Sequence, residues 1–350
     1  MRITQVIFSP GWGGAERLYV ELCLGLADAG CVVQCVVRDG FSRLALLEAH
    51  PAIHCVTLPA RGNWDLPSLW KLKKAVRDFA PDVIHAHLAR ATWMVGRVGQ
   101  TLKIPVLTTT HNRIKPKYFR RIDAFSTITR ELAGYLQEQG VANERIRPIP
   151  NFSLFPAVPA PAPRHPVTTT LVSYGRFVKK KGFEDLLRAM ATLVASTSEV
   201  RLLLGGDGPE KENLLALCRG LGLEEKVEFR GWVDDPAALL AEGDLFVLPS
   251  RDEPFGIVVL EAMAAGKTIV TTRTSGPVEV LDAETAWFAA IADPASLGAA
   301  LQEAVAAPEA CFEKAERALA LYRSAYTRDA VLPRFLDFYR DLAAGNKGVR

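Results

Sequence analysis

The sequence predicts a two-domain α/β protein in which each domain is a doubly wound parallel sheet. Three observations lead to this prediction. Short apolar runs alternate with helix-period segments along nearly the whole chain, a proline-rich stretch interrupts the alternation near residue 150, and 350 residues are many for one hydrophobic core. The composition, with 49% hydrophobic and 23% charged residues, is that of a globular protein.

The first domain is expected over residues 1–155. Its predicted strands are Ile3–Phe8, Val32–Val37, Val83–His87, Val106–Thr110 and Ala124–Ile128. Amphipathic stretches, such as Ala15–Ala29 and Pro67–Phe79, separate several of them, as βαβ units require.

A linker is expected over residues 156–166, where five prolines exclude a helix or a sheet interior. The prolines are Pro156, Pro159, Pro161, Pro163 and Pro166. The second domain is then expected over 167–327, and its predicted strands are Thr170–Tyr174, Arg201–Leu204, Lys226–Phe229, Leu245–Pro249 and Thr268–Thr272. The tail, Phe312–Leu342, is helix-like, and the sequence leaves open whether a C-terminal helix of about 328–350 packs back onto the first domain. Because ligands bind beyond the carboxyl ends of strands in such sheets, the site is expected in a cleft between the domains.

Charge is unevenly distributed along the chain. Residues 1–150 carry 20 Lys and Arg against 12 Asp and Glu, a net of +8, whereas residues 151–350 carry 22 against 27, a net of −5. The basic half favours an anionic partner. No apolar run approaches the roughly 20 residues that span a bilayer, and Arg2–Ser9 is too short for a signal peptide, so a cytoplasmic location is expected.

Six cysteines occur without a C-x-x-C pair, which predicts reduced and buried thiols rather than disulfides, with zinc ligation a remote alternative. They are Cys23, Cys31, Cys35, Cys55, Cys218 and Cys311.

Three glycine-rich segments invite a phosphate-binding interpretation. The segment Ser9–Glu16 follows a strand and opens a helix, but Glu16 stands where the dinucleotide pattern G-x-G-x-x-G requires its third glycine, and a plain tight turn is the alternative. The segment Leu202–Glu210 has the same form, and Asp207 within it either caps the next helix or lines the site. The third, Gly266-Lys-Thr, is not a P-loop, because Glu261 occupies the position of the first P-loop glycine; Gly266 is expected to end a helix.

Basic side chains follow the first strand of the second domain, where an anion would be held. Arg176 and Lys181 lie there beside two glycines, which predicts diphosphate binding, while Lys179 and Lys180 fit a solvated face better.

A second basic run lies in the first domain, and aromatic residues are interspersed in it. It comprises Arg113, Lys115, Lys117, Arg120 and Arg121. The run suits an anionic membrane surface or a phosphorylated acceptor, and a solvated loop explains it nearly as well. Nucleic acid fits poorly, because the rest of the chain is not basic.

Three histidines stand at predicted strand ends. His85 and His87 share one face of a strand and have no further metal ligands nearby in the sequence, so a structural or site-lining role is expected. His111 follows the strand Val106–Thr110 and suits hydrogen bonding or proton transfer.

Together these segments resemble glycosyltransferase family 4, the group 1 type of retaining glycosyltransferases, over nearly the whole chain. The matching motifs are Gly13-Gly14-Ala15-Glu16, Asp82–His87, Thr110-His111, Gly175-Arg176, Lys181-Gly182, Gly205–Pro209 and, most specifically, Glu253-Pro-Phe-Gly256 through Glu261-Ala-Met-Ala264. The resemblance implies the GT-B fold, two Rossmann-like domains that face a central cleft. It departs from the family at Asn151, at Lys267 and at Ser275-Gly276-Pro277, none of which is an expected catalytic group.

The resemblance also implies a role for each site residue. Arg176 and Lys181 would hold the diphosphate of a sugar donor, with the amides of Phe255, Gly256, Ile257 and Val258. Glu253 would bind the transferred sugar and Glu261 the ribose. Further donor contacts would come from Gly13 and Gly14, from Gly206, Asp207, Gly208 and Pro209, and from Trp232 and Val233. His111 would lie near the reacting carbon.

The activity implied is transfer of a hexose from a UDP- or GDP-linked donor to a glycan or glycolipid, with the anomeric configuration kept and no metal or other cofactor. The setting implied is lipopolysaccharide or other envelope polysaccharide synthesis, at the cytoplasmic face of a membrane. A nucleotide-sugar epimerase of the same fold and a non-catalytic nucleotide-sugar-binding protein are the alternatives.

Overall fold

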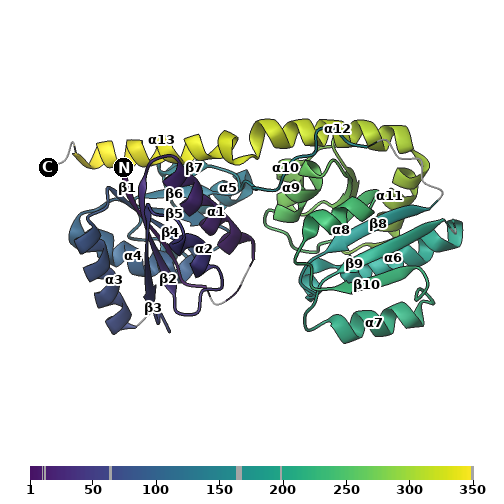
Figure 1. Cartoon of the computed structure of the whole chain (residues 1–350), viewed down its shortest axis with the longest axis horizontal. Helices are drawn as coiled ribbons and strands as arrows, with labels where there is room; N and C mark the ends of the chain where they lie inside the picture. The colour runs from purple at the N-terminus through teal and green to yellow at the C-terminus, as the bar shows by residue number, and fades with distance from the viewer. Residues whose placement is uncertain (10, 12, 63–64, 163–167, 198, 348–350) are drawn as a thin grey trace. The chain divides into compact units, whose positions relative to one another are not determined.

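The computed structural model describes residues 1–350 except 10, 12, 63–64, 163–167, 198 and 348–350. The chain divides into two compact units (Figure 1). The first unit comprises Met1–Leu154 with Thr327–Arg350, and the second Phe155–Tyr326. Among the described helices, none has the length and apolar character needed to cross a bilayer.

The first unit contains a seven-stranded parallel sheet, as far as the chain is described, in the order β3-β2-β1-β4-β5-β6-β7. Its strands are β1 Arg2–Ile7, β2 Val32–Arg38, β3 Ile53–Leu58, β4 Val83–His87, β5 Val106–Thr110, β6 Ala124–Thr127 and β7 Ile146–Pro148. Its helices are α1 Gly14–Asp28, α2 Leu44–Glu48, α3 Leu66–Phe79, α4 Leu88–Leu102, α5 Arg130–Glu138 and α13 Arg328–Lys347, with 3-10 turns η1 Pro116–Tyr118 and η2 Asn143–Arg145. Strands β4, β5 and β6 are buried along their whole length, which is why they read as continuous apolar or small-residue runs.

The second unit contains a six-stranded parallel sheet, again within the described residues, in the order β10-β9-β8-β11-β12-β13. Its strands are β8 Thr169–Tyr174, β9 Val200–Gly205, β10 Val227–Gly231, β11 Leu245–Leu248, β12 Thr268–Thr272 and β13 Trp287–Ala289. Its helices are α6 Phe183–Ser196, α7 Lys211–Gly220, α8 Pro236–Glu242, α9 Ile257–Ala264, α10 Ser275–Val280, α11 Pro294–Ala306 and α12 Pro308–Ala325, with the 3-10 turn η3 Lys179–Lys181. Both sheets confirm the predicted α/β class.

The C-terminal helix α13 packs within the first unit, against α1 and β4 (Figure 1). Its buried side chains include Val331, Phe335 and Tyr339, each at 0% exposure. Gly25 of α1 permits the close approach, since a Cβ there would lie 3.2 Å from Cδ of Arg328. The helix-like tail Phe312–Leu342 spans parts of two helices, α12 and α13, and α13 begins at Arg328, where the C-terminal helix of about 328–350 was expected. Thr327, just before α13, pairs with Ser153 in an isolated β-bridge.

The proline-rich segment has no helix or strand over its described part, 155–162, and hydrogen bonds join it to the rest of the second unit. Val158 N donates to the Ala264 carbonyl at 2.9 Å, and the Tyr322 hydroxyl donates to the Phe155 carbonyl at 2.8 Å. Pro163 and Pro166 lie outside the described residues.

All six cysteines are described, and each is a free thiol, as predicted; five are buried and Cys55 is half-buried. Burial raises the pKa of the Cys35 thiol well above its ordinary value.

Candidate active site

Several candidate site residues lie in loops that follow the strands at which the order of each sheet reverses. In the second unit β8 and β11 are neighbours, and the chain continues outward from them to β9 and β12 on opposite sides. Lys181 lies in the loop after β8 and Glu253 in the loop after β11. In the first unit β1 and β4 hold the same position; Gly13 follows β1 and His87 ends β4. Such a reversal leaves a crevice at the carboxyl ends of the strands, the usual ligand position in this fold class.

An ion pair joins the two loops of the second unit. Lys181 Nζ donates a hydrogen bond to Glu253 Oε2, across 72 residues of sequence. The Lys181 side chain is 20% exposed and that of Glu253 10% exposed. The pair is therefore shielded enough for strong charge interaction and still open to a ligand. The Ser250 hydroxyl lies 3.4 Å from the same carboxylate oxygen.

Backbone contact between the loops fixes this pair. Gly182 has φ +68°, and a Cβ on it would lie 1.9 Å from the Pro249 carbonyl oxygen, so only glycine allows the approach. The Arg251 amide donates to the Lys180 carbonyl at 2.8 Å. The Arg251 guanidinium also binds both oxygens of Asp185, at 2.7 and 2.6 Å. This bidentate pair, which the sequence pattern did not reveal, braces the loop that carries Glu253.

Helix α9 begins at Ile257, four residues after Glu253. Gly256, at φ +85°, precedes the first helical residue, so the amides of Ile257 and Val258 belong to the first turn, whose N–H groups have no partner within the helix. Phe255 is held against Gly276, where a Cβ would lie 2.3 Å from the Phe255 Cα. The helix dipole and these amides together favour an anion at this position.

Glu261 lies on α9 and is fully buried. The Tyr174 hydroxyl, at the end of β8, donates to its Oε2 at 2.5 Å. Contact between a ribose and Glu261 therefore requires Tyr174 to share this carboxylate. The sequence reading missed Tyr174, although its position directly before Gly175-Arg176 at a strand end was a usable signal.

The loop Gly206–Pro209 packs against the loop after β8. A Cβ on Gly208, which has φ +151°, would lie 2.6 Å from the Phe177 carbonyl oxygen, so a side chain has no room there. Asp207 Oδ1 accepts from the Gly208 amide at 2.7 Å, and Lys211 Nζ donates to its Oδ2 at 2.9 Å. The hydrogen bond from Lys211, and then that from Gly208, lowers the Asp207 pKa. Its carboxylate thus pairs with the side chain of Lys211, the first residue of α7, whereas Glu210 occupies the N-cap position of that helix, so these contacts give no support to the helix-capping alternative.

Of the remaining donor-site candidates in this unit, three are exposed to solvent and one packs against a glycine of a neighbouring strand. Trp232 is 52% exposed after β10, and Pro209 and Arg176 are exposed as well. Val233 faces Gly205, where a Cβ would lie 2.3 Å from Val233 Cγ2. An exposed indole beside a glycine loop suits stacking of a planar ring.

In the first unit, Gly13 caps α1 and Gly14 is its first residue. A Cβ on Gly13 would lie 3.3 Å from Oε2 of Glu16, which is 7% exposed. Pro10 and Trp12 of this predicted loop lie outside the described residues.

The three histidines form a buried cluster. The His85 and His87 rings lie 4.3 Å apart between centroids, on one face of β4 as predicted. His111 is 8% exposed, and its Nε2 lies 3.2 Å from Nδ1 of His87. Burial lowers the pKa of His111 to about 4, and burial lowers the pKa values of His85 and His87 well below the ordinary value. All three imidazoles are neutral at pH 7.

The basic run lies between β5 and β6, around η1. Lys115, Lys117, Arg120 and Arg121 are exposed. Arg113 differs from them, since its guanidinium is bound to Glu131, with Nε 2.9 Å from Oε1.

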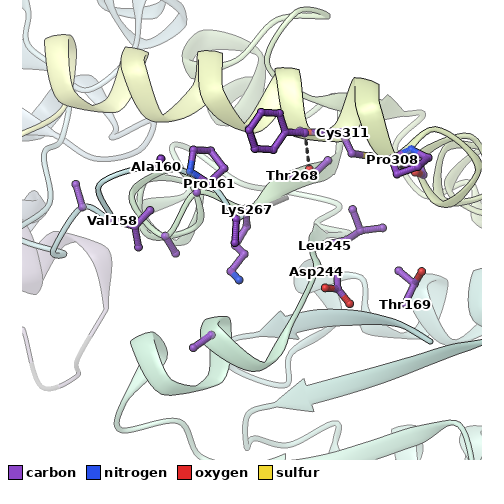
Figure 2. A pocket seen from close by; sticks show the side chains of 18 of the residues that line it. Val158, Ala160, Pro161, Thr169, Asp244, Leu245, Lys267, Thr268, Pro308 and Cys311 are labelled. Carbon is purple, nitrogen blue, oxygen red and sulfur yellow. Dashed lines mark hydrogen bonds between the residues drawn. The ribbon is translucent and has the colours of Figure 1, made fainter. Parts of the chain in front are cut away.

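A cavity of about 450 Å³ lies elsewhere in the second unit, away from the candidate residues (Figure 2). Thr169, Leu245 and Thr268, the first residues of β8, β11 and β12, line it, and so do Val158 and Pro161 of the proline-rich segment. Lys181 and Glu253 follow the opposite ends of these strands. Lys267, the second residue of the Gly266-Lys-Thr segment, also lines this cavity and donates to the Gly243 carbonyl at 2.8 Å.

No group of three or more His, Cys, Asp or Glu side chains in the described part of the chain is arranged to hold a metal ion.

Two family models match the chain in the order of its units. Residues 12–152 match the model described as Glycosyltransferase Family 4, and residues 163–319 match that described as Glycosyl transferases group 1. Two relatives from Rhizobium meliloti are the lipopolysaccharide core biosynthesis glycosyltransferases LpsE and LpsD. LpsE is 32% identical, with 96% of this chain and 98% of LpsE covered, and LpsD is 30% identical, with 97% and 98% covered.

Solved structures share the fold at low sequence identity. The crystal structure of HepE from Anabaena with UDP and glucose superposes with a TM-score of 0.83 at 19% identity, covering 97% of this chain and 100% of HepE. The lipopolysaccharide outer core galactosyltransferase WaaB, in its apo form, gives a TM-score of 0.79 at 16% identity, covering 99% and 100%.

Proposed function

This chain belongs to glycosyltransferase family 4, with a group 1 glycosyltransferase domain, and from that membership we propose which sugar-transfer reaction it performs and how its residues act. The proposal is transfer of a hexose from a UDP- or GDP-sugar to a glycan or glycolipid acceptor, with the anomeric configuration kept. The observation that carries it is the Lys181–Glu253 pair beside the first turn of α9, where two loops meet at the strand-order reversal. The comparisons give no support to an epimerase or a non-catalytic binder.

The diphosphate of the donor binds where positive charge and free amides meet. Lys181 and Arg176 provide the cationic groups, and the amides of Phe255–Val258 lie at the positive end of the α9 dipole. Glu253 neutralises Lys181 in the ion pair. A diphosphate competes for the same ammonium, and its departure as the leaving group develops negative charge that these groups stabilise.

The transferred sugar and the nucleoside occupy opposite sides of this anion position. Glu253 has two carboxylate oxygens, so it accepts sugar hydroxyls with the one that Lys181 leaves available. Glu261 accepts the ribose hydroxyls together with Tyr174. The loop Gly206–Pro209 and the Trp232-Val233 turn hold the base. Membership of the family supports further donor contacts by Gly13, Gly14 and His111.

The cationic side chains and helix amides perform the charge neutralisation that a divalent ion performs in other transferases, so no metal is required. The proposal for the acceptor follows the relatives: a lipopolysaccharide or other envelope polysaccharide.

The exposed residues Lys115, Lys117, Arg120 and Arg121 attract an anionic membrane surface that holds such an acceptor. Sedimentation with vesicles of neutral lipid, and of the same lipid with an anionic component, tests this part. Binding should appear only with the anionic vesicles and weaken as salt rises, because exposed charges are screened. Equal sedimentation with both vesicle types contradicts it.

A thermal-shift screen across UDP- and GDP-sugars identifies the donor, because a ligand that binds only the folded state raises the melting temperature. One base and one sugar should give the largest shift, and Lys181→Ala should abolish it. The matched control is Lys179→Ala, in the same 3-10 turn and exposed. Loss of the shift in both variants, or in neither, contradicts the assignment of the diphosphate position.

A further inference from the structure

Six buried side chains of the first unit form one continuous hydrogen-bonded chain. In order they are His111, His87, Gln5, Tyr339, His85 and Thr109, and consecutive contacts measure 3.2, 3.0, 2.9, 2.7 and 2.8 Å. They come from β1, β4, β5, the residue after β5, and the C-terminal helix α13. Five of the six are at most 1% exposed, and His111 is 8% exposed. The chain therefore runs through the interior and comes closest to solvent at His111.

The amide of Gln5 gives this chain a direction. Its nitrogen donates to the Tyr339 hydroxyl, and its oxygen lies 3.0 Å from His87 Nε2. A carbonyl oxygen only accepts, so His87 carries its proton on Nε2. A neutral imidazole has a single N–H, so the His87 Nδ1 accepts, and the donor to it is Nε2 of His111. The remaining nitrogen of His111, Nδ1, then has a lone pair and no proton.

This direction of the hydrogen-bonded chain requires all three imidazoles to be neutral, and their surroundings keep them neutral. Burial is the main cause of the lowered pKa of each ring, and the other histidines lower the pKa values of His85 and His87 further. Packed against the rings are neutral aromatic groups: Tyr19 of α1 lies 5.4 Å from His87, and Phe335 of α13 lies 5.9 Å from His85. On the far side, the Tyr339 hydroxyl accepts from Gln5 and donates to Nδ1 of His85, whose Nε2 donates to Thr109.

We propose that Tyr339 and Gln5 are positioning residues that hold His111 in its Nε2–H tautomer, so that Nδ1 accepts a hydrogen bond from a hydroxyl of the bound sugar or acceptor. This inference rests on the proposed function for the substrate, and on the hydrogen-bonded chain alone for the tautomer. If Nδ1 of His111 carried the proton instead, it would be a donor and could not accept the hydrogen bond from this hydroxyl. The C-terminal helix thus has a role in the chemistry of the first unit beyond packing.

The experiment is nitrogen-15 NMR of histidine-labelled protein at pH 7, with the His111 signals assigned by their absence in His111→Asn. Wild type should show His111 protonated on Nε2 and unprotonated on Nδ1. Tyr339→Phe removes the acceptor for the Gln5 amide and lets that amide turn round, so the Nδ1–H form of His111 should increase. In the same variant kcat should fall by roughly tenfold, the size of one misdirected hydrogen bond, with little change in KM for the donor.

Two further variants separate a positioning role from a structural one. Gln5→Leu removes the acceptor for His87 Nε2 and the donor to Tyr339, so the Nδ1–H form of His111 should increase as it does in Tyr339→Phe. Tyr322→Phe is the control: Tyr322 is also buried, at 1% exposure, and its hydroxyl donates to the Phe155 carbonyl in the other unit, so the His111 signals should not change.

Wild-type protein with His111 protonated on Nδ1 overturns the proposal, and so does a tautomer that Tyr339→Phe leaves unchanged. Because the spectrum is recorded without substrate, it also separates the two claims. The predicted tautomer in a protein that transfers no sugar refutes the proposed function and not the tautomer assignment.

Discussion

Lowering the pH from 8 to 5 should destabilise the first unit through its three buried histidines. Their pKa values are depressed in the folded protein and ordinary in the unfolded chain, so the unfolded chain binds more protons as the pH falls below about 6.5. The stability they contribute is therefore fully present above that pH. It is lost progressively as the pH falls toward the folded-state value, about 4 for His111.

The magnitude follows from the distance between the pH and the unfolded pKa. At pH 5 the solution is about 1.5 units below the pKa of a histidine in the unfolded chain. Each histidine that stays neutral in the fold then lowers the free energy of unfolding by about 1.4 kcal/mol per unit, or about 2 kcal/mol. Three such groups lower the free energy of unfolding by about 6 kcal/mol, which approaches the whole stability of a typical domain. Few carboxylates titrate in this window, because their ordinary pKa values lie near 4.

Urea titrations followed by circular dichroism, at half-unit steps from pH 8 to 5, measure this loss. The transition of the second unit, Phe155–Tyr326, contains none of the three histidines and serves as the internal reference. His111→Asn should reduce the loss at pH 5 to about 4 kcal/mol, two thirds of the wild-type value. A first-unit stability that is constant or rises between pH 7 and 5 refutes the reasoning.

Three further predictions concern the second unit and the reaction. Lys181→Ala should lower kcat/KM by about 10²- to 10³-fold, the usual effect of removing one group that stabilises developing charge. Initial rates of nucleotide release measure this effect, and a wild-type rate contradicts the role of Lys181 in stabilising the leaving group. Gly182→Ala should lower the free energy of unfolding by at least about 1 kcal/mol more than Gly222→Ala. Both glycines have positive φ, +68° and +65°, but only a Cβ on Gly182 would meet backbone atoms. Equal denaturant midpoints for the two variants contradict the close contact of Gly182 with the Pro249 carbonyl. Finally, transfer should proceed at the same rate in EDTA, and a rate restored only by added divalent metal argues against charge neutralisation by side chains and amides.

Much of the fold was predictable because buried parallel strands leave continuous apolar runs. The strands Val83–His87 and Val106–Thr110 have the predicted bounds, and β8 begins one residue earlier than predicted. Strand β3, Ile53–Leu58, was missed because it lies at a sheet edge, where exposed His54 and Thr57 interrupt the apolar run. The start of the C-terminal helix was predictable as well: a helix expected at about 328–350 runs from Arg328 to Lys347.

The site was predictable as residue types at strand ends, and its contacts were not. The positions of Lys181 and Glu253 after strands indicated an anion site. Their direct pairing, however, arises because β8 and β11 are adjacent in the sheet, and no local sequence pattern predicts that adjacency. Gln5 and Tyr339 lie 334 residues apart, and only the packing of α13 brings them together. The pairing of Tyr174 with Glu261 is non-local in the same way.

The central claim is tested most directly by the product of one reaction. Purified protein is incubated with the nucleotide sugar that gives the largest thermal shift and with a truncated lipopolysaccharide acceptor, and the new glycosidic bond is examined by NMR. The account predicts one added hexose with the anomeric configuration of the donor, in wild type and not in Lys181→Ala. An inverted linkage, or an altered free donor with no glycoside formed, contradicts it.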